Sequence, residues 1–243
     1  MNVWIADNHE ALSKEAVIRL LTALSAKPNL LLCAAGGSTP TRTYQLLVER
    51  YSANPTLFQS LRIIKLDEWG GIAPDDPGSC ETQLRKLLVN PLRLPAEHYF
   101  ALASNPENPE LECSRISDHL AKDGPIDLCL LGLGVNGHLG MNEPASHLQA
   151  GPHVAHLTDV SLRHPMLANS HTRPSYGLTL GMRDIMVSRQ ILLLVSGANK
   201  RDALQRLMQR AITTQFPASF LWMHPNCQLL CDRDAASAPK LNL

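Results

Sequence analysis

Short, continuous runs of apolar residues recur along this chain and constrain its fold more than any other feature of the sequence. Such runs are typical of parallel strands buried on both faces, whereas a strand with one wet face alternates. Segments of helical spacing separate the runs. This order predicts a doubly wound α/β fold, in which a mostly parallel sheet carries helices on both faces. The predicted strands are 29–34, 61–66, 126–133, 177–180, 190–196 and 227–230, and the predicted helices are 39–50, 80–89, 109–121 and 200–211.

The chain contains enough apolar sequence for one substantial core. Apolar residues make up 44% of its 243 residues and charged residues 18%, which argues against disorder. No repeat, low-complexity stretch or linker divides it, so we expect a single domain over 1–243. The segment 145–175 is polar and weakly periodic, which makes it a candidate lid.

The charge balance excludes partners that are held by bulk charge. Lys plus Arg and Asp plus Glu number 22 each, so we expect neither a nucleic acid nor a membrane as partner, but a small-molecule substrate. A homo-oligomer stays open. No apolar run is long enough to cross a bilayer and no signal peptide opens the chain, so we expect a cytoplasmic protein.

The six cysteines predict no metal site. None forms a CxxC pair, and no second Cys/His pair accompanies Cys227 and Cys231 at zinc-site spacing. Cysteines inside apolar runs behave as small hydrophobic residues. We therefore expect buried free thiols.

The loops that follow the strands are the places to look for chemistry, because ligands of doubly wound sheets bind beyond the carboxyl ends of the strands. The first loop runs from Gly36 through Gly37, Ser38 and Thr39 into a predicted helix. Two glycines permit close approach of a ligand, and free amides at a helix N-terminus attract anions. An ordinary turn, capped by Thr39, explains the same residues equally well.

The second and third loops carry acid–base side chains. Asp67 and Glu68 follow the strand 61–66, where a solvated turn competes with a catalytic base. The third loop contains a GxGxxG pattern at 132–137, but Asn142-Glu143-Pro144 breaks the chain too soon for a dinucleotide-binding helix. Instead it offers His138, which can transfer protons near neutral pH, and Glu143, which can fix the imidazole tautomer.

The fourth loop, 197–201, contains Lys200, which could meet a phosphate or merely be solvated. Arg173, before the strand at 177–180, is a second candidate cation. His153 and His156 lack further ligands nearby in the sequence, so we expect them to be solvated.

Together these motifs resemble the glucosamine-6-phosphate deaminase family, which shares its fold with 6-phosphogluconolactonases and ribose-5-phosphate isomerase. The resemblance covers nearly the whole chain. Asn142-Glu143-Pro144 separates the deaminases from the lactonases, which differ after the shared Gly-His. The matching residues are Gly36–Pro40, Leu66–Trp69, Gly132–His138, Asn142–Pro144, Gly197–Lys200, Pro217–Ser219 and His224.

The resemblance implies catalytic roles without a cofactor. Asp67 matches the base that takes the C2 proton, and His138 the group that opens the pyranose ring at O5. Glu143 matches the carboxylate that orients His138, and Asn136 stands where some members have Asp. The implied phosphate ligands are the loop residues Gly37, Ser38 and Thr39, together with Arg173 and Lys200.

The sequence around Trp69 most resembles the galactosamine-6-phosphate branch of the family. Members of that branch convert galactosamine 6-phosphate to tagatose 6-phosphate and ammonia. Glucosamine 6-phosphate, giving fructose 6-phosphate, is the alternative, and a lactonase or a non-catalytic sugar-phosphate sensor is more remote. In some relatives, basic residues after Asn-Glu-Pro bind an activator, N-acetylglucosamine 6-phosphate. The same stretch here, 145–157, contains no Lys or Arg, so we expect no such activation.

Overall fold

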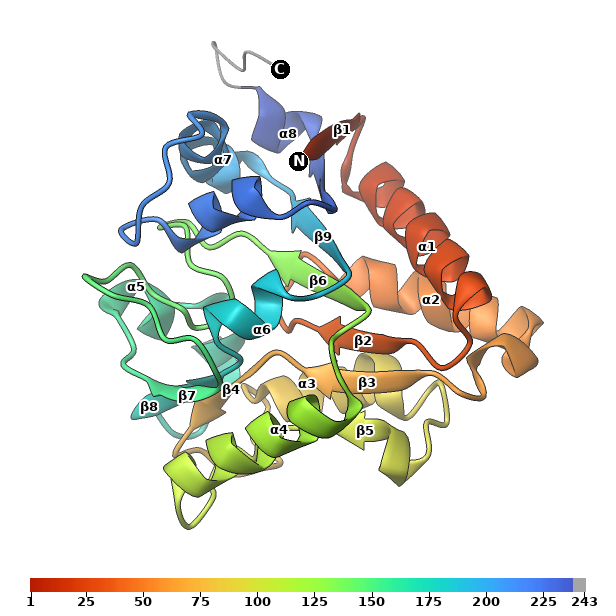
Figure 1. Cartoon of the computed structure of the whole chain (residues 1–243), viewed down its shortest axis with the longest axis horizontal. Coiled ribbons are helices and arrows are strands. Elements are labelled where there is room, and N and C mark those ends of the chain that lie inside the picture. Colours follow the sequence, from red (N-terminus) through yellow and green to blue (C-terminus); the bar gives the residue numbers. More distant parts are fainter. Residues whose placement is uncertain (238–243) are drawn as a thin grey trace.

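A computed structural model describes residues 1–237 and contains two sheets (Figure 1). The strands are β1 (Asn2–Ala6), β2 (Leu31–Ala34), β3 (Arg62–Lys65), β4 (Asp67–Gly70), β5 (Tyr99–Phe100), β6 (Leu128–Gly132), β7 (His153–Ala155), β8 (Tyr176–Thr179), β9 (Gln190–Val195) and β10 (Cys227–Asp232). The α-helices are α1 (His9–Ala26), α2 (Thr41–Ala53), α3 (Cys80–Leu84), α4 (Pro109–Asp123), α5 (Asp159–Leu162), α6 (Met182–Met186), α7 (Arg201–Met208) and α8 (Arg233–Ala236). The other helical turns are η1 (Pro55–Phe58), η2 (Arg85–Val89), η3 (Ala96–His98), η4 (Pro165–Asn169), η5 (Ala198–Lys200) and η6 (Pro217–Met223).

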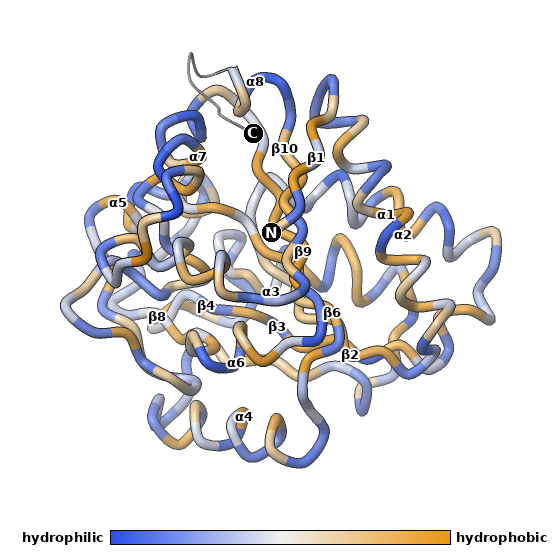
Figure 2. The backbone as a smooth tube through the Cα atoms, turned by 45° about the horizontal axis from the view of Figure 1, so that its top comes forward, coloured by the Kyte–Doolittle hydropathy of each residue, from blue (hydrophilic) through white to orange (hydrophobic). Residues whose placement is uncertain are grey.

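The larger sheet has seven strands in the order β1-β10-β9-β6-β2-β3-β5, and every neighbouring pair is parallel. Its central strands β6 and β9 are mainly apolar, with the sequences LCLLG and QILLLV (Figure 2), because helices cover both faces. The doubly wound α/β prediction is therefore confirmed.

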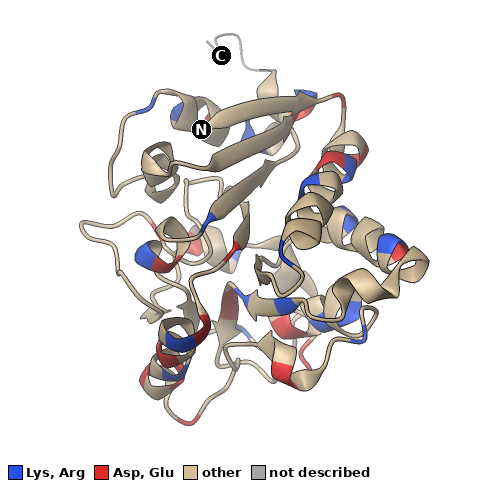
Figure 3. Cartoon of the chain, turned by 45° about the vertical axis from the view of Figure 1, so that its right-hand side comes forward, with Lys and Arg blue, Asp and Glu red and all other residues tan. Residues whose placement is uncertain are grey.

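Side-chain alternation along the strands divides the core into two layers. Leu32, Leu130 and Leu192 point toward α1 and α2, whereas Cys129 and Leu193 point toward α4, α6 and α7. Charged residues lie mainly on the helices (Figure 3), where one face stays in water. All six cysteines are buried free thiols, as predicted.

Capping residues and prolines in the sequence determine where some of the helices begin. Asn108 caps α4 by accepting a hydrogen bond from the Leu111 amide, and Pro109 occupies the first turn. The predicted capping of α2 by Thr39 is wrong: α2 begins at Thr41, and Pro40 precedes it without a side-chain cap. Residues 1–28 carry no prediction above, yet they form β1 and α1; Leu12, Ala16, Leu20 and Leu24 give α1 its buried face.

The smaller sheet is the main departure from the predicted fold. Its order is β4-β8-β7, and both pairs are antiparallel. The strand predicted at 177–180 belongs to this sheet, not to the parallel one, and the loop expected at Asp67 is strand β4. The reason is a change of partner at Leu66, whose amide donates to Ala34 of β2 while its carbonyl accepts from Leu180 beyond β8.

The candidate lid, 145–175, contains β7, α5 and η4. Leu157, Leu162, Met166 and Leu167 pack beside Trp69 in a small apolar cluster apart from the two main layers. No helix within residues 1–237 is long and apolar enough to cross a membrane.

Candidate active site

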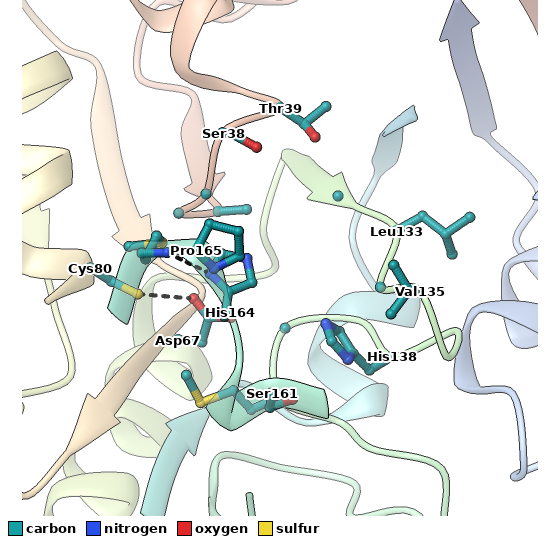
Figure 4. A pocket seen from close by; sticks show the side chains of 18 of the residues that line it. Ser38, Thr39, Asp67, Cys80, Leu133, Val135, His138, Ser161, His164 and Pro165 are labelled. Carbon is teal, nitrogen blue, oxygen red and sulfur yellow. Dashed lines mark hydrogen bonds between the residues drawn. The ribbon is translucent and has the colours of Figure 1, made fainter. Parts of the chain in front are cut away.

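A cavity of about 500 Å³ opens beyond the carboxyl ends of the parallel strands. The loops after β2, β6 and β9 line it, together with β4 and part of the segment 145–175 (Figure 4). Of the candidate site residues, the wall contains Gly37, Ser38, Thr39, Asp67, His138 and Lys200. The four loops singled out in the sequence therefore surround one space, as expected for this sheet topology.

The loop after β2 presents hydrogen-bond donors to the cavity. Within the described residues, neither the amides nor the hydroxyls of Ser38 and Thr39 donate a hydrogen bond to the protein, which leaves them available to a ligand. The Gly37 amide is different, because it donates to Gln83 Oε1 at 2.8 Å, and Gln83 Nε2 donates back to the Gly37 carbonyl at 3.1 Å. Gly37 therefore shapes the loop, while Ser38 and Thr39 carry its free donors.

Within the part of the chain that the structure describes, two cationic side chains lie on the cavity wall. Lys200 donates to the Leu133 carbonyl at 2.6 Å, and burial lowers the pKa of its ammonium group. Its loop is held by Asp232, which accepts hydrogen bonds from Ser196 and from the Gly197 amide. The second cation is Arg163.

Arg173 does not meet the sequence-based expectation. It is exposed, and among residues 1–237 it is not part of the cavity wall. The chain runs from α5 through η4 back to β8, so Arg163 comes to the cavity while Arg173 lies farther along the connection. The polar sequence around both residues carries no signal that distinguishes them.

Asp67 lies at the start of β4, on the face that lines the cavity together with Trp69. Alternation turns Glu68 to the other side, where it is fully buried. Glu68 accepts hydrogen bonds from the ammonium of Lys65 at 2.6 Å and from the amides of Cys80 and Glu81 at 2.9 and 2.8 Å. Lys65 also pairs with Glu81 at 2.8 Å. The strand beneath Asp67 is thus anchored by a buried ion-pair network.

The environment of Asp67 favours its protonated form more than water does. Burial chiefly raises the pKa of Asp67 to about 6, and the charge of Glu68 adds to this, while His138 and Lys65 oppose it. Among residues 1–237, the side-chain hydrogen bond to this carboxylate is a weak one, from the Cys80 thiol at 3.8 Å (Figure 4). A carboxylate with few hydrogen-bond partners and a raised pKa is well suited to accept a proton near neutral pH.

His138 is placed by close packing of a glycine loop. A Cβ at Gly134 would collide with the imidazole ring, and one at Gly137 would collide with the ring of Phe216. Gly137 also has φ of +88°, a conformation that favours glycine. The Ala218 amide donates to the Gly137 carbonyl at 2.8 Å, so the Pro217–Ser219 motif supports this loop from behind.

A carboxylate stands beside the His138 imidazole. His138 Nδ1 lies 3.6 Å from Glu143 Oε2, which is longer than a hydrogen bond. Asn136 donates to Glu143 Oε2 at 2.8 Å and accepts from the His138 amide at 3.2 Å, so it holds the loop and the carboxylate together. Ser161 donates to Glu143 Oε1. Burial acts to raise the pKa of Glu143, but the nearby His138, Ser161 and Asn136 outweigh it and hold the pKa below its usual value.

The cavity residues missing from the sequence-based set include the polar side chains of Ser161, Arg163 and His164. These three come from the segment 145–175. His153 and His156 are not on the wall as described by residues 1–237. Nor does that part of the chain bring three or more His, Cys, Asp or Glu side chains together as a metal site would require.

Comparison with known proteins places the chain in a family. Residues 6–230 match the family described as glucosamine-6-phosphate isomerases/6-phosphogluconolactonase. The chain belongs to this family of enzymes. A relative in Escherichia coli (strain K12), AgaI, is named as a deaminase; it is 41% identical over 90% of this chain and 87% of its own length. Glucosamine-6-phosphate deaminase of Geobacillus sp. (strain WCH70) is 35% identical over 98% of this chain and 95% of its own length.

Solved structures of the family share the fold. A monomeric glucosamine-6-phosphate deaminase superposes with a TM-score of 0.93 at 32% identity and covers 98% of this chain, with 99% of its own length matched. The 6-phosphogluconolactonase of Leishmania guyanensis superposes with a TM-score of 0.80 at 20% identity, over 98% of each chain, and at that identity the likeness concerns the fold alone.

Proposed function

We propose that this chain isomerises and deaminates a 2-amino-2-deoxyhexose 6-phosphate, giving a 2-ketohexose 6-phosphate and ammonia. The observation that carries this proposal is the shared cavity of Asp67 and His138, with the donors of Ser38 and Thr39 on the same wall. One proton acceptor and one imidazole within reach of an anchored sugar are what an aldose–ketose conversion requires.

The phosphate binds at Ser38, Thr39, Lys200 and Arg163. The free amides and hydroxyls of the loop supply directed donors, and the two side chains supply positive charge. This anchor lies away from the reacting carbons, so its binding energy orients the sugar without taking part in bond changes.

His138 opens the pyranose ring. At Nε2 the imidazole can take the proton of the anomeric hydroxyl and deliver a proton to O5, which breaks the C1–O5 bond and leaves an aldehyde at C1. Glu143 favours the tautomer with the proton on Nδ1, since the carboxylate lies on that side at 3.6 Å. Nε2 then exchanges protons with the substrate.

Asp67 carries out the next step. The open-chain aldehyde acidifies the C2 proton, and the carboxylate removes it while O1 gains a proton, which gives an enolamine with a hydroxyl on C1 and the amino group on C2. Return of a proton to C1 gives an imine at C2. Water adds to this imine, ammonia leaves, and the C2 ketone remains.

Galactosamine 6-phosphate, converted to tagatose 6-phosphate, is the preferred substrate in this proposal. Trp69, on the cavity wall beside Asp67, supports it, as does the resemblance of the surrounding sequence to that branch. AgaI and the glucosamine-6-phosphate deaminases match at comparable levels, so the comparisons do not separate the two epimers.

An ammonia-release assay with both epimers tests the proposal. We expect ammonia from both compounds, and a higher kcat/KM for galactosamine 6-phosphate. A clear preference for glucosamine 6-phosphate would reverse the choice of epimer. Release of no ammonia, together with hydrolysis of 6-phosphogluconolactone, would identify a lactonase instead.

A further inference from the structure

His164 lies on the cavity wall, yet none of the steps above uses it. It stands between α5 and η4 in the segment 145–175 and lines the cavity next to Arg163. In Figure 4 its imidazole is on the Asp67 side of the space, with His138 and Val135 across from it.

The hydrogen bonding of His164 determines what it offers to a ligand. The Met166 amide donates to His164 Nδ1 at 3.3 Å, so in the neutral ring the proton is on Nε2. Burial is the main cause that lowers the pKa of His164 to about 4, and the charges of His138 and Lys200 contribute, so the ring is neutral at physiological pH. Within residues 1–237 no protein acceptor takes the Nε2 proton. His164 therefore presents a neutral N–H donor to the cavity.

Packing against Trp69 holds the imidazole in place. The two ring centroids are 6.0 Å apart with an interplanar angle of 43°. Trp69 is 5% exposed and lies two residues after Asp67, so both project from the same face of β4. This packing directs the Nε2–H of His164 to the side of the cavity that contains Asp67.

The position of His164 determines which edge of a bound hexose it faces. Under the proposed function, on which this step rests, His138 meets the O5–C1 edge and Asp67 meets C2. The C3–C4 edge lies opposite O5–C1 in a pyranose. A group across from His138 and next to Asp67 therefore faces the hydroxyls of C3 and C4.

We infer that His164 is a specificity-determining residue whose Nε2–H donates a hydrogen bond to a hydroxyl oxygen on the C3–C4 edge of the substrate. A site built to hydrogen-bond a hydroxyl discriminates strongly against a sugar that lacks this hydroxyl or carries it in another orientation. Because C4 is the carbon that differs between the galacto and gluco substrates, this donor is placed to contribute to the choice between them.

Two substitutions test the donor. His164→Phe keeps an aromatic ring against Trp69 but removes the N–H, whereas the side-chain amide of His164→Gln can place an N–H near the position of Nε2. We expect Phe to lower kcat/KM by roughly 10- to 100-fold and Gln to recover most of that loss. His156→Gln is the matched control, since His156 is exposed in the same segment and outside the described wall; it should match the unmodified chain.

Deoxy substrates separate recognition from structure. On the 3-deoxy or the 4-deoxy amino-sugar phosphate, whichever lacks the accepting hydroxyl, the unmodified chain and His164→Phe should differ by less than about threefold, because the hydrogen bond is already absent. Equal loss on the parent sugar and both analogues, or no loss at all, would overturn the inference. If His164→Phe unfolds at assay temperature, His164→Ala takes its place. Failure of the unmodified chain to release ammonia would contradict the proposed function instead.

Discussion

The cavity has two walls that are built in different ways. The strand-end wall (Ser38, Asp67, His138 and Lys200) follows directly from strands buried on both faces. The segment wall (Ser161, Arg163 and His164) comes from a connection with one four-residue helix and one short 3₁₀ helix, packed on a small apolar cluster. A buried ion pair supports Asp67, whereas within residues 1–237 the side chain of Arg163 is held by a hydrogen bond from Nε to the Asp159 carbonyl at 3.1 Å.

This difference in construction indicates different roles for the two walls. Acid–base groups need positions fixed to a fraction of an ångström, and the strand ends supply them. Groups that grip the phosphate and read hydroxyls can lie on a segment that opens and closes, which is the role we predicted for 145–175 as a lid. We test below whether the acid–base chemistry resides in the strand-end wall, and whether Arg163 and His164 of the segment wall add to the phosphate binding by Ser38, Thr39 and Lys200.

The largest effect should follow from removing the carboxylate on the strand-end wall. We expect Asp67→Asn to lower kcat by roughly 10²- to 10⁴-fold with little change in KM, because the amide cannot accept the C2 proton. In the unmodified chain kcat/KM should fall as pH drops through about 6, where this carboxylate becomes protonated. Asp75→Asn, on an exposed side chain, is the control; near-normal turnover of Asp67→Asn would remove the assignment.

Replacement of His138 should come next. His138→Ala should lower turnover of the cyclic substrate by about 10²-fold or more, and Glu143→Gln by less, because the carboxylate acts through the imidazole. A substrate supplied in open-chain form should partly restore both variants. Equal damage on closed and open substrates would show that the pair does not act in ring opening.

Ionised Asp67 should lower the free energy of unfolding at neutral pH. Its pKa in the folded chain, about 6, exceeds the ordinary value of 3.8, so the folded state holds this proton more tightly than the unfolded state does. The free energy of unfolding is therefore highest below about pH 4, where the carboxyl is protonated in both states, and it falls as pH rises through 6. The difference corresponds to at most about 3 kcal/mol. We therefore expect Asp67→Asn to unfold at higher denaturant than the unmodified chain at pH 7 and at similar denaturant at pH 4. A less stable variant at pH 7 would show that the carboxylate stabilises the strand.

A smaller effect should distinguish the two arginines. Arg163→Met and Lys200→Met should each raise KM by roughly 10- to 100-fold, because each loses a charged hydrogen bond to phosphate. Arg173→Met should stay within about threefold of the unmodified chain, since Arg173 is exposed outside the described wall. The reverse order would mean that the segment wall rearranges when substrate binds.

The smallest effect concerns the acetylated sugar phosphate. We expect hyperbolic kinetics that N-acetylglucosamine 6-phosphate leaves unchanged, because 145–157 offers no Lys or Arg for a second phosphate. Initial rates over a range of substrate concentrations, with and without this compound, provide the measurement. Sigmoidal kinetics that become hyperbolic on its addition would reveal a second site.

Much of the architecture was predictable because parallel strands buried on both faces leave long apolar runs. Residues 190–195 and 128–132 were found in this way. The smaller sheet was not, because Asp67–Gly70 pairs with Tyr176–Thr179, more than a hundred residues away, and local sequence carries no trace of that partner. At the N-terminus the helical spacing of Leu12, Ala16 and Leu20 was present but unused.

The sequence by itself determined the strand-end wall of the candidate site. Loops after buried parallel strands must emerge at one edge, so Ser38, Asp67, His138 and Lys200 could be brought together by topology alone. Only the tertiary structure decided the segment wall, where Arg163 lines the cavity and Arg173 does not, and where His164 turns its free donor inward. The physical reason is that a polar, weakly periodic connection has no buried face to set its path, so its course depends on packing against Trp69 and Met141 from distant elements.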